Sequence, residues 1–263
     1  MLEMEKTRDF FYSGKVQLEQ PKNGYRATID SCLLTYFISQ NDEKWNYGIE
    51  LGFGTGLIGI GLILGGFIKR IIGIEIQDEL AELAIKNIFV NEVEKEITII
   101  KTDLRSICQD NMEKADIIVM NPPYWKKDKR VISGNMNFQK RTAYHEEMGE
   151  LDDWIKTSKK IMRLKKGRIF IVYPIKRINY LISTLKKYEI YAQKICFVHQ
   201  NQITDAQSVL VMAGYRNAEN LTVRKPIILE KMNGKPTKEA ELILNGNFSE
   251  RFKKLRDRRK LIF

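Results

Sequence analysis

The sequence predicts an α/β fold built on a seven-stranded mixed sheet, with one antiparallel strand and helices on both faces. Short apolar runs typical of buried strands alternate with stretches of helical periodicity through most of the chain. Only residues 200–207 separate the last two runs, residues 191–198 and 209–215. A crossover helix needs about a dozen residues or more, so this last pair should be antiparallel.

The segment ahead of the sheet is expected to form a hairpin and a short helix. The runs 16–20 and 25–28 flank Asn23 and Gly24, a dipeptide typical of tight hairpin turns. Residues 31–39 follow as a short helix.

The first half of the sheet region alternates strands with helices. Apolar runs predict the strands, and apolar residues at helical spacing predict the helices. A glycine loop, Gly52–Gly56, separates the first strand from the first helix, and Asp78 is expected to cap the second helix. The strands are expected at residues 47–51, 70–76 and 97–100, and the helices at residues 57–64 and 79–90.

The second half continues this alternation. Gly167 ends the first of its helices, and Pro174 stops the strand that comes next. The strands are expected at residues 115–120, 168–173, 191–198 and 209–215, and the helices at residues 151–164 and 177–188.

The glycine loop indicates a ligand that approaches the backbone closely. Gly52, Gly54 and Gly56 permit positive φ and lie just before a helix N-terminus. A dinucleotide-binding loop has the spacing G-x-G-x-x-G, which would require glycine at the position of Leu57. The G-x-G-x-G spacing of this chain argues against a pyrophosphate ligand.

Three acidic residues, Glu50, Glu75 and Asp103, stand at the ends of successive predicted strands. Glu75 lies roughly 20 residues beyond the glycine loop, where a carboxylate accepts hydrogen bonds from ribose hydroxyls. Asp103 is placed to accept a hydrogen bond from an adenine amino group. One such acid is more often a solvated surface residue, but three around one glycine loop predict a nucleotide-type site.

Asn121-Pro122-Pro123-Tyr124 follows an apolar run and suits methylation of an exocyclic amine. The lone pair of an aromatic amine is delocalised into its ring, so two hydrogen-bond acceptors must draw it out. The Asn121 side-chain oxygen and the Pro122 carbonyl can accept the two N–H groups, and the prolines stiffen the backbone that aims them. Tyr124 offers a face on which a base can stack. Alone, such a tetrapeptide would more often simply end a strand.

The order of these motifs resembles the class I S-adenosylmethionine-dependent methyltransferases. The matching segments are E-L-G-F-G-T-G at residues 50–56, G-I-E-I at 73–76, K-T-D-L at 101–104 and N-P-P-Y at 121–124. Residues 24–34 and 141–146 look like segments of the bacterial tRNA1(Val) (adenine-37-N6)-methyltransferases. This resemblance runs from about residue 15 to about residue 215, and it implies a Rossmann-like class I methyltransferase fold.

The resemblance also implies S-adenosylmethionine as the cofactor. In that family the segment equivalent to Thr28 and Asp30 packs over the methionine end of the cofactor. Glu50 stands where aspartate is commoner, and Phe53 is bulkier than the usual loop residue. The implied cofactor-binding residues are Thr28, Asp30, Glu50, Gly52, Gly54, Gly56, Glu75, Asp103 and Asn121, and the expected catalytic residues are Asn121, Pro122, Pro123 and Tyr124.

Three regions are expected along the chain. Residues 1–40 form an N-terminal hairpin and helix that cover the cofactor site, and residues 41–215 form the methyltransferase domain. Residues 216–263 form a basic C-terminal extension that the resemblance does not reach, so no functional residue is assigned to it.

The net charge of +11, with a pI near 9.4, favours a polyanionic partner. Dispersed lysines often mark only solvated surface, so clusters are more informative than the total. The expected RNA-binding residues near the tetrapeptide are Lys126, Lys127, Lys129, Arg130 and Arg141. A second cluster is either an RNA-binding arm or a charged tail: Arg251, Lys253, Lys254, Arg256, Arg258, Arg259 and Lys260.

Membrane, secreted and metal-binding classes are disfavoured. No apolar run approaches the roughly 20 residues of a membrane span, and the charged N-terminus does not resemble a signal peptide. Cys32, Cys108 and Cys196 are far apart and lack metal-ligand spacing. We expect a cytoplasmic monomer that binds tRNA and needs neither a metal nor a membrane.

The sequence therefore predicts a methyltransferase that acts on N6 of adenine 37 in the anticodon loop of a tRNA. The same chemistry on protein glutamine N5, rRNA guanine N2 or DNA adenine stays open, as does a non-catalytic RNA-binding module. A nicotinamide oxidoreductase is disfavoured by the loop spacing. The reaction needs no general base, so His145 and Glu146 are expected to shape their loop or to fix the start of a helix.

Overall fold

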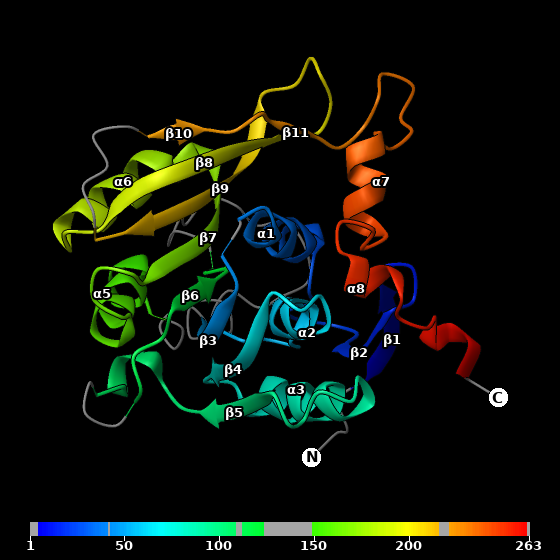
Figure 1. Cartoon of the computed structure of the whole chain (residues 1–263), viewed down its shortest axis with the longest axis horizontal. Helices are drawn as coiled ribbons and strands as arrows, with labels where there is room; N and C mark the ends of the chain where they lie inside the picture. The colour runs from blue at the N-terminus through cyan, green and yellow to red at the C-terminus, as the bar shows by residue number, and fades with distance from the viewer. Residues whose placement is uncertain (1–4, 42, 109–111, 124–148, 216–220, 262–263) are drawn as a thin grey trace.

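A sheet of nine strands lies at the centre of the molecule, with helices on both faces (Figure 1). The computed structural model describes residues 5–41, 43–108, 112–123, 149–215 and 221–261. The strand order is β10-β8-β9-β7-β6-β3-β4-β5, and β11 also pairs with β8. The strands are β3 (Trp45–Leu51), β4 (Ile68–Glu75), β5 (Ile97–Lys101), β6 (Ile117–Met120), β7 (Arg168–Pro174), β8 (Tyr191–His199), β9 (Ala206–Gly214), β10 (Thr222–Val223) and β11 (Ile227–Ile228).

All seven strands predicted for the central sheet are present, and the predicted fold class is confirmed. β9 runs antiparallel to both of its neighbours, β7 and β8. The other pairs of this sheet within the described residues are parallel. Sequence reasoning missed β10 and β11, because two-residue strands are too short to show an alternating pattern.

The central strands send alternate side chains into two apolar layers. In β6, Ile117 and Val119 belong to the layer packed against α1, α2 and α3, whereas Ile118 and Met120 belong to the layer packed against α5 and α6. Covering both faces buries every residue of β6, which explains its uninterrupted apolar run. The helices are α1 (Ile29–Ser39), α2 (Leu57–Leu64), α3 (Asp78–Val90), α5 (Leu151–Ile161) and α6 (Ile178–Lys187), with short 3-10 turns η1 (Leu104–Ser106) and η3 (Ile175–Arg177).

The N-terminal hairpin forms, but its strands differ from those predicted. β1 (Lys6–Phe11) pairs antiparallel with β2 (Val16–Pro21), and the turn between them places Tyr12, Ser13 and Gly14 at positive φ. The prediction of a turn at Asn23–Gly24 was wrong, as was that of a strand over residues 25–28. Instead, the backbone N–H of Ala27 in that segment donates to a side chain of β2.

The predicted cap of α3 was also wrong by one residue. Gln77 occupies the N-cap position, and Asp78 is the first helical residue. The Asp78 carboxylate pairs with Lys101 at 2.7 Å, at the end of the neighbouring β5. An acid in the first turn still favours the helix through the helix dipole.

The C-terminal segment folds back against the N-terminal hairpin (Figure 1). It contains α7 (Lys238–Leu244), α8 (Glu250–Lys253) and the turn η4 (Arg258–Leu261). Phe252 is fully buried, with its ring centroid 4.8 Å from that of Tyr12. In the basic cluster of this segment, Arg256 pairs with Glu92 and Arg258 donates to two backbone carbonyls of the main body.

Arg258 is expected to stabilise the fold. Its nearly buried guanidinium donates to the carbonyls of Val90 at 2.6 Å and Asn91 at 3.0 Å, at the C-terminus of α3. Arg258→Ala should therefore lower the free energy of unfolding by about 2 kcal/mol. Arg256→Ala, which breaks only an exposed pair, should cost less than about 1 kcal/mol. Urea denaturation of both variants checks this, and equal losses would contradict it.

Within the described residues, no helix combines the length and apolar character needed to cross a membrane. The same part of the chain contains no group of three or more His, Cys, Asp or Glu side chains arranged to hold a metal ion.

Candidate active site

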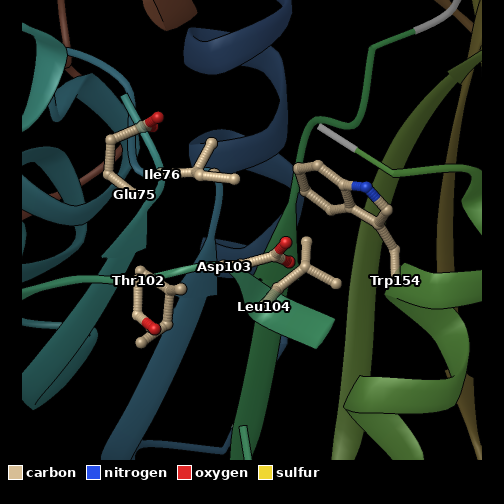
Figure 2. A pocket seen from close by; sticks show the side chains of 8 residues that line it. Glu75, Ile76, Thr102, Asp103, Leu104 and Trp154 are labelled. Atoms are coloured by element: carbon tan, nitrogen blue, oxygen red, sulfur yellow. The ribbon is translucent and has the colours of Figure 1, made fainter. Parts of the chain in front are cut away.

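A pocket opens at the carboxyl ends of β4 and β5 (Figure 2). This is the edge of an open α/β sheet where ligands usually bind. The indole of Trp154, from α5, closes one side of it. The lining residues are Gly52, Ile74, Glu75, Ile76, Thr102, Asp103, Leu104 and Trp154.

The glycine loop has no room for larger residues. Gly52, Gly54 and Gly56 all have positive φ, at 67°, 57° and 95°. A Cβ on Gly52 would lie 2.5 Å from the Trp154 indole, and a Cβ on Gly54 would lie 2.6 Å from the Tyr25 ring. Both the backbone conformation and the close neighbours therefore require glycine at these positions.

Glu75 presents a buried, oriented carboxylate in the pocket wall. One carboxylate oxygen accepts from the Gly54 backbone N–H at 2.8 Å, and the other accepts from the Gln77 N–H at 2.9 Å. Burial raises the pKa of Glu75, and these backbone hydrogen bonds oppose that rise. Each carboxylate oxygen can accept more than one hydrogen bond, so the group can also hold ribose hydroxyls.

Asp103 lines the same pocket but is paired with a neighbour. Its carboxylate accepts from the Arg105 backbone N–H at 2.8 Å and from two guanidinium nitrogens, with the Arg105 Nη2 at 2.6 Å. The hydrogen bond from the Arg105 side chain lowers the pKa of Asp103, so this acid stays ionised. Its predicted contact with an adenine amino group would have to share the carboxylate with Arg105.

Glu50 is buried beside α2 and does not line the pocket. Its Oε2 has no hydrogen-bond partner within the described residues. Burial raises the pKa of Glu50 well above its ordinary value, the Gly59 backbone opposes this, and the charge of Glu75 adds to it. A buried oxygen without a partner suits a ligand that brings a donor group, such as an ammonium.

The raised pKa of Glu50 predicts a pH-dependent stability in the protein without cofactor. The pKa of Glu50 is higher in the folded protein than in the unfolded chain. The free energy of unfolding therefore falls as the pH rises from the unfolded-state pKa to the folded-state pKa of this group. Glu50→Gln removes this loss, so it should melt at a higher temperature than the unaltered protein at about pH 8, with a smaller difference near pH 5. Thermal melts across this range check it, and a difference independent of pH would contradict it.

Thr28 and Asp30 stand at the start of α1, outside the pocket lining. Thr28 is exposed and makes no side-chain cap hydrogen bond. The Asp30 carboxylate accepts a hydrogen bond of 3.3 Å from the Ser208 hydroxyl of β9. Burial raises the pKa of Asp30, and the Ser208 hydrogen bond opposes this.

The Asn-Pro-Pro segment leaves the sheet next to the glycine loop. Leu51 of β3 pairs with Met120 of β6, so Gly52 and Asn121 are the next residues on adjacent strands. Pro122 is buried, and Asn121 and Pro123 are half-buried. His145 and Glu146 lie outside the described residues. So do the remaining predicted catalytic and RNA-binding residues, which are Tyr124, Lys126, Lys127, Lys129, Arg130 and Arg141.

Sequence reasoning did not assign Trp154 to the site. It identified this residue only as an apolar position of a helix, and nothing in the helical pattern distinguishes a core tryptophan from one that also walls a pocket. Ile74, Ile76, Thr102 and Leu104 were also missed, because they enter the pocket only as chain neighbours of Glu75 and Asp103.

The family model of the TRM5/TYW2 methyltransferase domain matches residues 37–172 of this chain. The tRNA1(Val) (adenine(37)-N6)-methyltransferase of Histophilus somni is 28% identical over 172 residues, 65% of this chain and 70% of that protein. A protein of the same name from a Flavobacteriaceae bacterium is 20% identical over 236 residues, 90% of this chain and 96% of that protein. The resemblance predicted from the motifs is confirmed.

A solved structure of a predicted O-methyltransferase from Agrobacterium tumefaciens has a similar fold. Its TM-score is 0.64 at 19% identity, covering 84% of this chain and 97% of that chain. The site residues fit S-adenosylmethionine, because the oriented Glu75 carboxylate, the glycine loop without space for side chains, and the unpartnered Glu50 oxygen all suit it. The chain belongs to the TRM5/TYW2 methyltransferase domain family, and its cofactor is S-adenosylmethionine.

Proposed function

We propose that this protein methylates N6 of an adenine in RNA, at adenine 37 in the anticodon loop of a tRNA of the tRNA1(Val) type. The observation that carries the proposal is the position of Asn121-Pro122-Pro123, which leaves the sheet beside the glycine loop. The relatives that share the name tRNA1(Val) (adenine(37)-N6)-methyltransferase support the choice of substrate. The reaction would take place in the cytoplasm.

In the proposed mechanism the target adenosine leaves its stack and enters the site. The Asn121 side-chain oxygen and the Pro122 carbonyl accept the two N6–H groups, which draws the nitrogen lone pair out of conjugation. S-adenosylmethionine, when bound, supplies an electrophilic methyl group. Positive charge would develop on N6 as its bond to the methyl group forms and the bond between that methyl group and the cofactor sulfur breaks, and the two preorganised acceptors would stabilise it without a general base. The methylated amine would then lose one proton to water. Tyr124 stacks on the base.

The cofactor would be held by groups on several strand ends. Glu75 would accept from its ribose hydroxyls and Asp103 from its adenine amino group, while Glu50 would face its ammonium. Thr28 and Asp30, in the region of residues 1–40 that covers the site, would contact the methionine end. The backbone of the glycine loop, at Gly52, Gly54 and Gly56, would pack against the cofactor. Asn121 would also contact it.

Phosphates that flank the target base would contact Lys126, Lys127, Lys129, Arg130 and Arg141. Alanine variants at four of these positions, Lys126, Lys127, Lys129 and Arg130, should reduce the salt dependence of tRNA binding. The slope of log affinity against log salt concentration should change by about one unit for each phosphate that the side chains no longer neutralise. Lys44, Lys69, Lys95 and Lys166 provide a matched control, because all four are exposed at or near the opposite edge of the sheet. Equal slopes in the two quadruple variants would assign the first cluster to solvation alone.

The direct test is transfer of labelled methyl from S-adenosylmethionine to unmodified tRNA, followed by digestion to nucleosides. The proposal predicts label in N6-methyladenosine, with little in DNA or in protein supplied at equal concentration. Label in DNA or protein alone would identify one of the other amines as the substrate. RNA binding without transfer to any acceptor would identify a non-catalytic module.

A further inference from the structure

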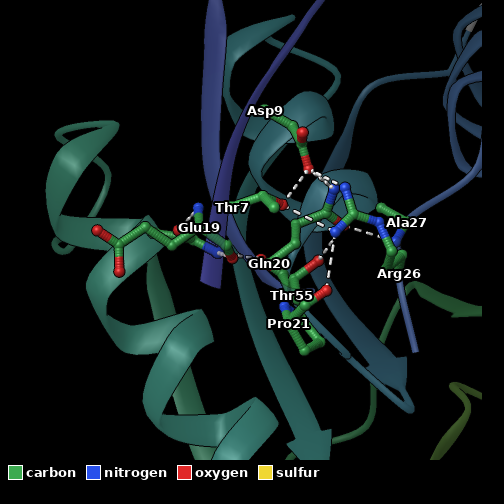
Figure 3. Close-up of polar contacts among 9 residues, drawn as sticks. Thr7, Asp9, Glu19, Gln20, Pro21, Arg26, Ala27 and Thr55 are labelled. Carbon is green, nitrogen blue, oxygen red and sulfur yellow. Dashed lines mark hydrogen bonds and ion pairs between the residues drawn. The ribbon is translucent and has the colours of Figure 1, made fainter. Parts of the chain in front are cut away.

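A hydrogen-bonded network connects β2, the segment leading into α1 and the glycine loop (Figure 3). The buried side chain of Gln20, from β2, lies at its centre. Gln20 Oε1 accepts from the backbone N–H of Ala27 at 2.7 Å and from the hydroxyl of Thr55 at 3.3 Å. Thr55 belongs to the glycine loop, and Ala27 belongs to the segment leading into α1. One amide oxygen thus ties both segments to β2.

The Gln20 amide is itself held in a defined orientation. Its nitrogen donates to the Asp9 carboxylate of β1, which also accepts from Arg26. The Arg26 guanidinium further donates to the Thr7 hydroxyl and the Pro21 carbonyl, each at 2.8 Å. Because the backbone N–H of Ala27 can only donate and the Asp9 carboxylate can only accept, only one orientation of the Gln20 amide satisfies both.

A second buried amide holds the glycine loop from the α3 side. The Asn87 nitrogen donates to the carbonyls of Thr55 at 2.9 Å and Glu19 at 3.0 Å, and its oxygen accepts from the Glu19 N–H at 2.7 Å. Asn91, four residues further on at the C-cap of α3, makes the same pair of bonds with Gln17 of β2. Its third bond goes to the Asn87 carbonyl within α3. Asn87 and Asn91 therefore hold β2 in the same way. The further bond of Asn87 goes to the glycine loop, whereas that of Asn91 goes to α3.

The segment before α1 also contacts the loop directly. The Tyr25 ring lies against Gly54, where an added Cβ would come within 2.6 Å of the Tyr25 Cε1. Gly54 donates its N–H to Glu75, so displacement of the loop would also displace a donor from the pocket carboxylate. Changes in the network should therefore reach the cofactor pocket.

We propose that Gln20 and Asn87 are positioning residues, which fix the glycine loop and residues 25–28 in one arrangement before the cofactor binds. The inference rests on the proposed function, because it takes this loop and segment as the surfaces that contact S-adenosylmethionine. Without either amide, a buried donor or carbonyl of the loop loses its partner and the loop samples other conformations. Cofactor binding must then also order the loop, which lowers the affinity.

The test is calorimetric titration of the full chain with S-adenosylmethionine. Gln20→Leu and Asn87→Ala should each raise the Kd roughly tenfold, whereas the control Asn91→Ala should stay within about twofold of the unaltered protein. Melting temperatures of Asn87→Ala and Asn91→Ala should fall by similar amounts, since both lose their bonds to β2. With saturating cofactor, kcat should stay within about twofold, so the effect appears in KM for the cofactor.

A similar Kd for Asn87→Ala and Asn91→Ala would overturn the inference, because a structural role alone would affect both variants alike. This pair decides the question even if Gln20→Leu does not fold. Failure of the unaltered protein to bind S-adenosylmethionine would instead overturn the cofactor assignment on which the inference rests. The titration uses no RNA, so the choice of RNA substrate does not affect its outcome.

Discussion

Asn121→Ala should abolish detectable methyl transfer to tRNA, while the protein still binds S-adenosylmethionine. Removing one preorganised group that stabilises developing charge typically lowers kcat by about 100-fold to 1000-fold. The effect should fall on kcat, because the acceptor acts on the nitrogen most strongly as positive charge develops there. Single-turnover transfer of labelled methyl measures the rate, and calorimetry measures the cofactor affinity.

Asn121→Asp is the matched variant for this test. Aspartate keeps an acceptor oxygen at the same distance from the backbone, so it should retain more activity than alanine. Retained activity in Asn121→Ala would contradict the role given to Asn121. Loss of cofactor binding in Asn121→Ala would show that the residue acts on the cofactor site instead.

Glu75→Ala should weaken S-adenosylmethionine binding by about 100-fold or more. Two hydrogen bonds from ribose hydroxyls to a carboxylate contribute about 1.5–3 kcal/mol each. The variant also removes the acceptor of the Gly54 N–H, so the glycine loop loses an anchor. Calorimetric titration measures the affinity.

Asp103→Ala is the comparison for Glu75→Ala. Asp103 is more exposed than Glu75 and already accepts from Arg105, so its removal should raise the Kd by only about tenfold. Glu75→Gln keeps one acceptor oxygen, so its Kd for S-adenosylmethionine should lie between those of the two alanine variants. Unchanged affinity in Glu75→Ala would contradict the assignment of this pocket to the cofactor.

The sheet was predictable because its central strands are buried on both faces. β6 shows this clearly, since uninterrupted burial gives an uninterrupted apolar run. β1 was missed because its sequence, K-T-R-D-F-F, places charged residues in a strand that is only partly covered. Its strand geometry depends on pairing with β2, which sequence periodicity does not reveal.

Part of the candidate site could also be predicted, because the carboxyl ends of parallel strands meet at one edge of the sheet. Gly52, Glu75 and Asp103 come together in the pocket for this reason. Gln20 and Asn87 could not be assigned, since their roles depend on partners far away in the chain. For Asn87, the sequence signal of a special role was a polar residue on the apolar stripe of α3.

The most direct test of the central claim is nucleoside mapping by mass spectrometry of tRNA from cells with and without the gene. We predict that N6-methyladenosine at position 37 of one tRNA disappears without the gene and returns when the unaltered protein is restored. Restoring Asn121→Ala should leave adenine 37 unmethylated. An unchanged level of N6-methyladenosine in tRNA without the gene would contradict the account.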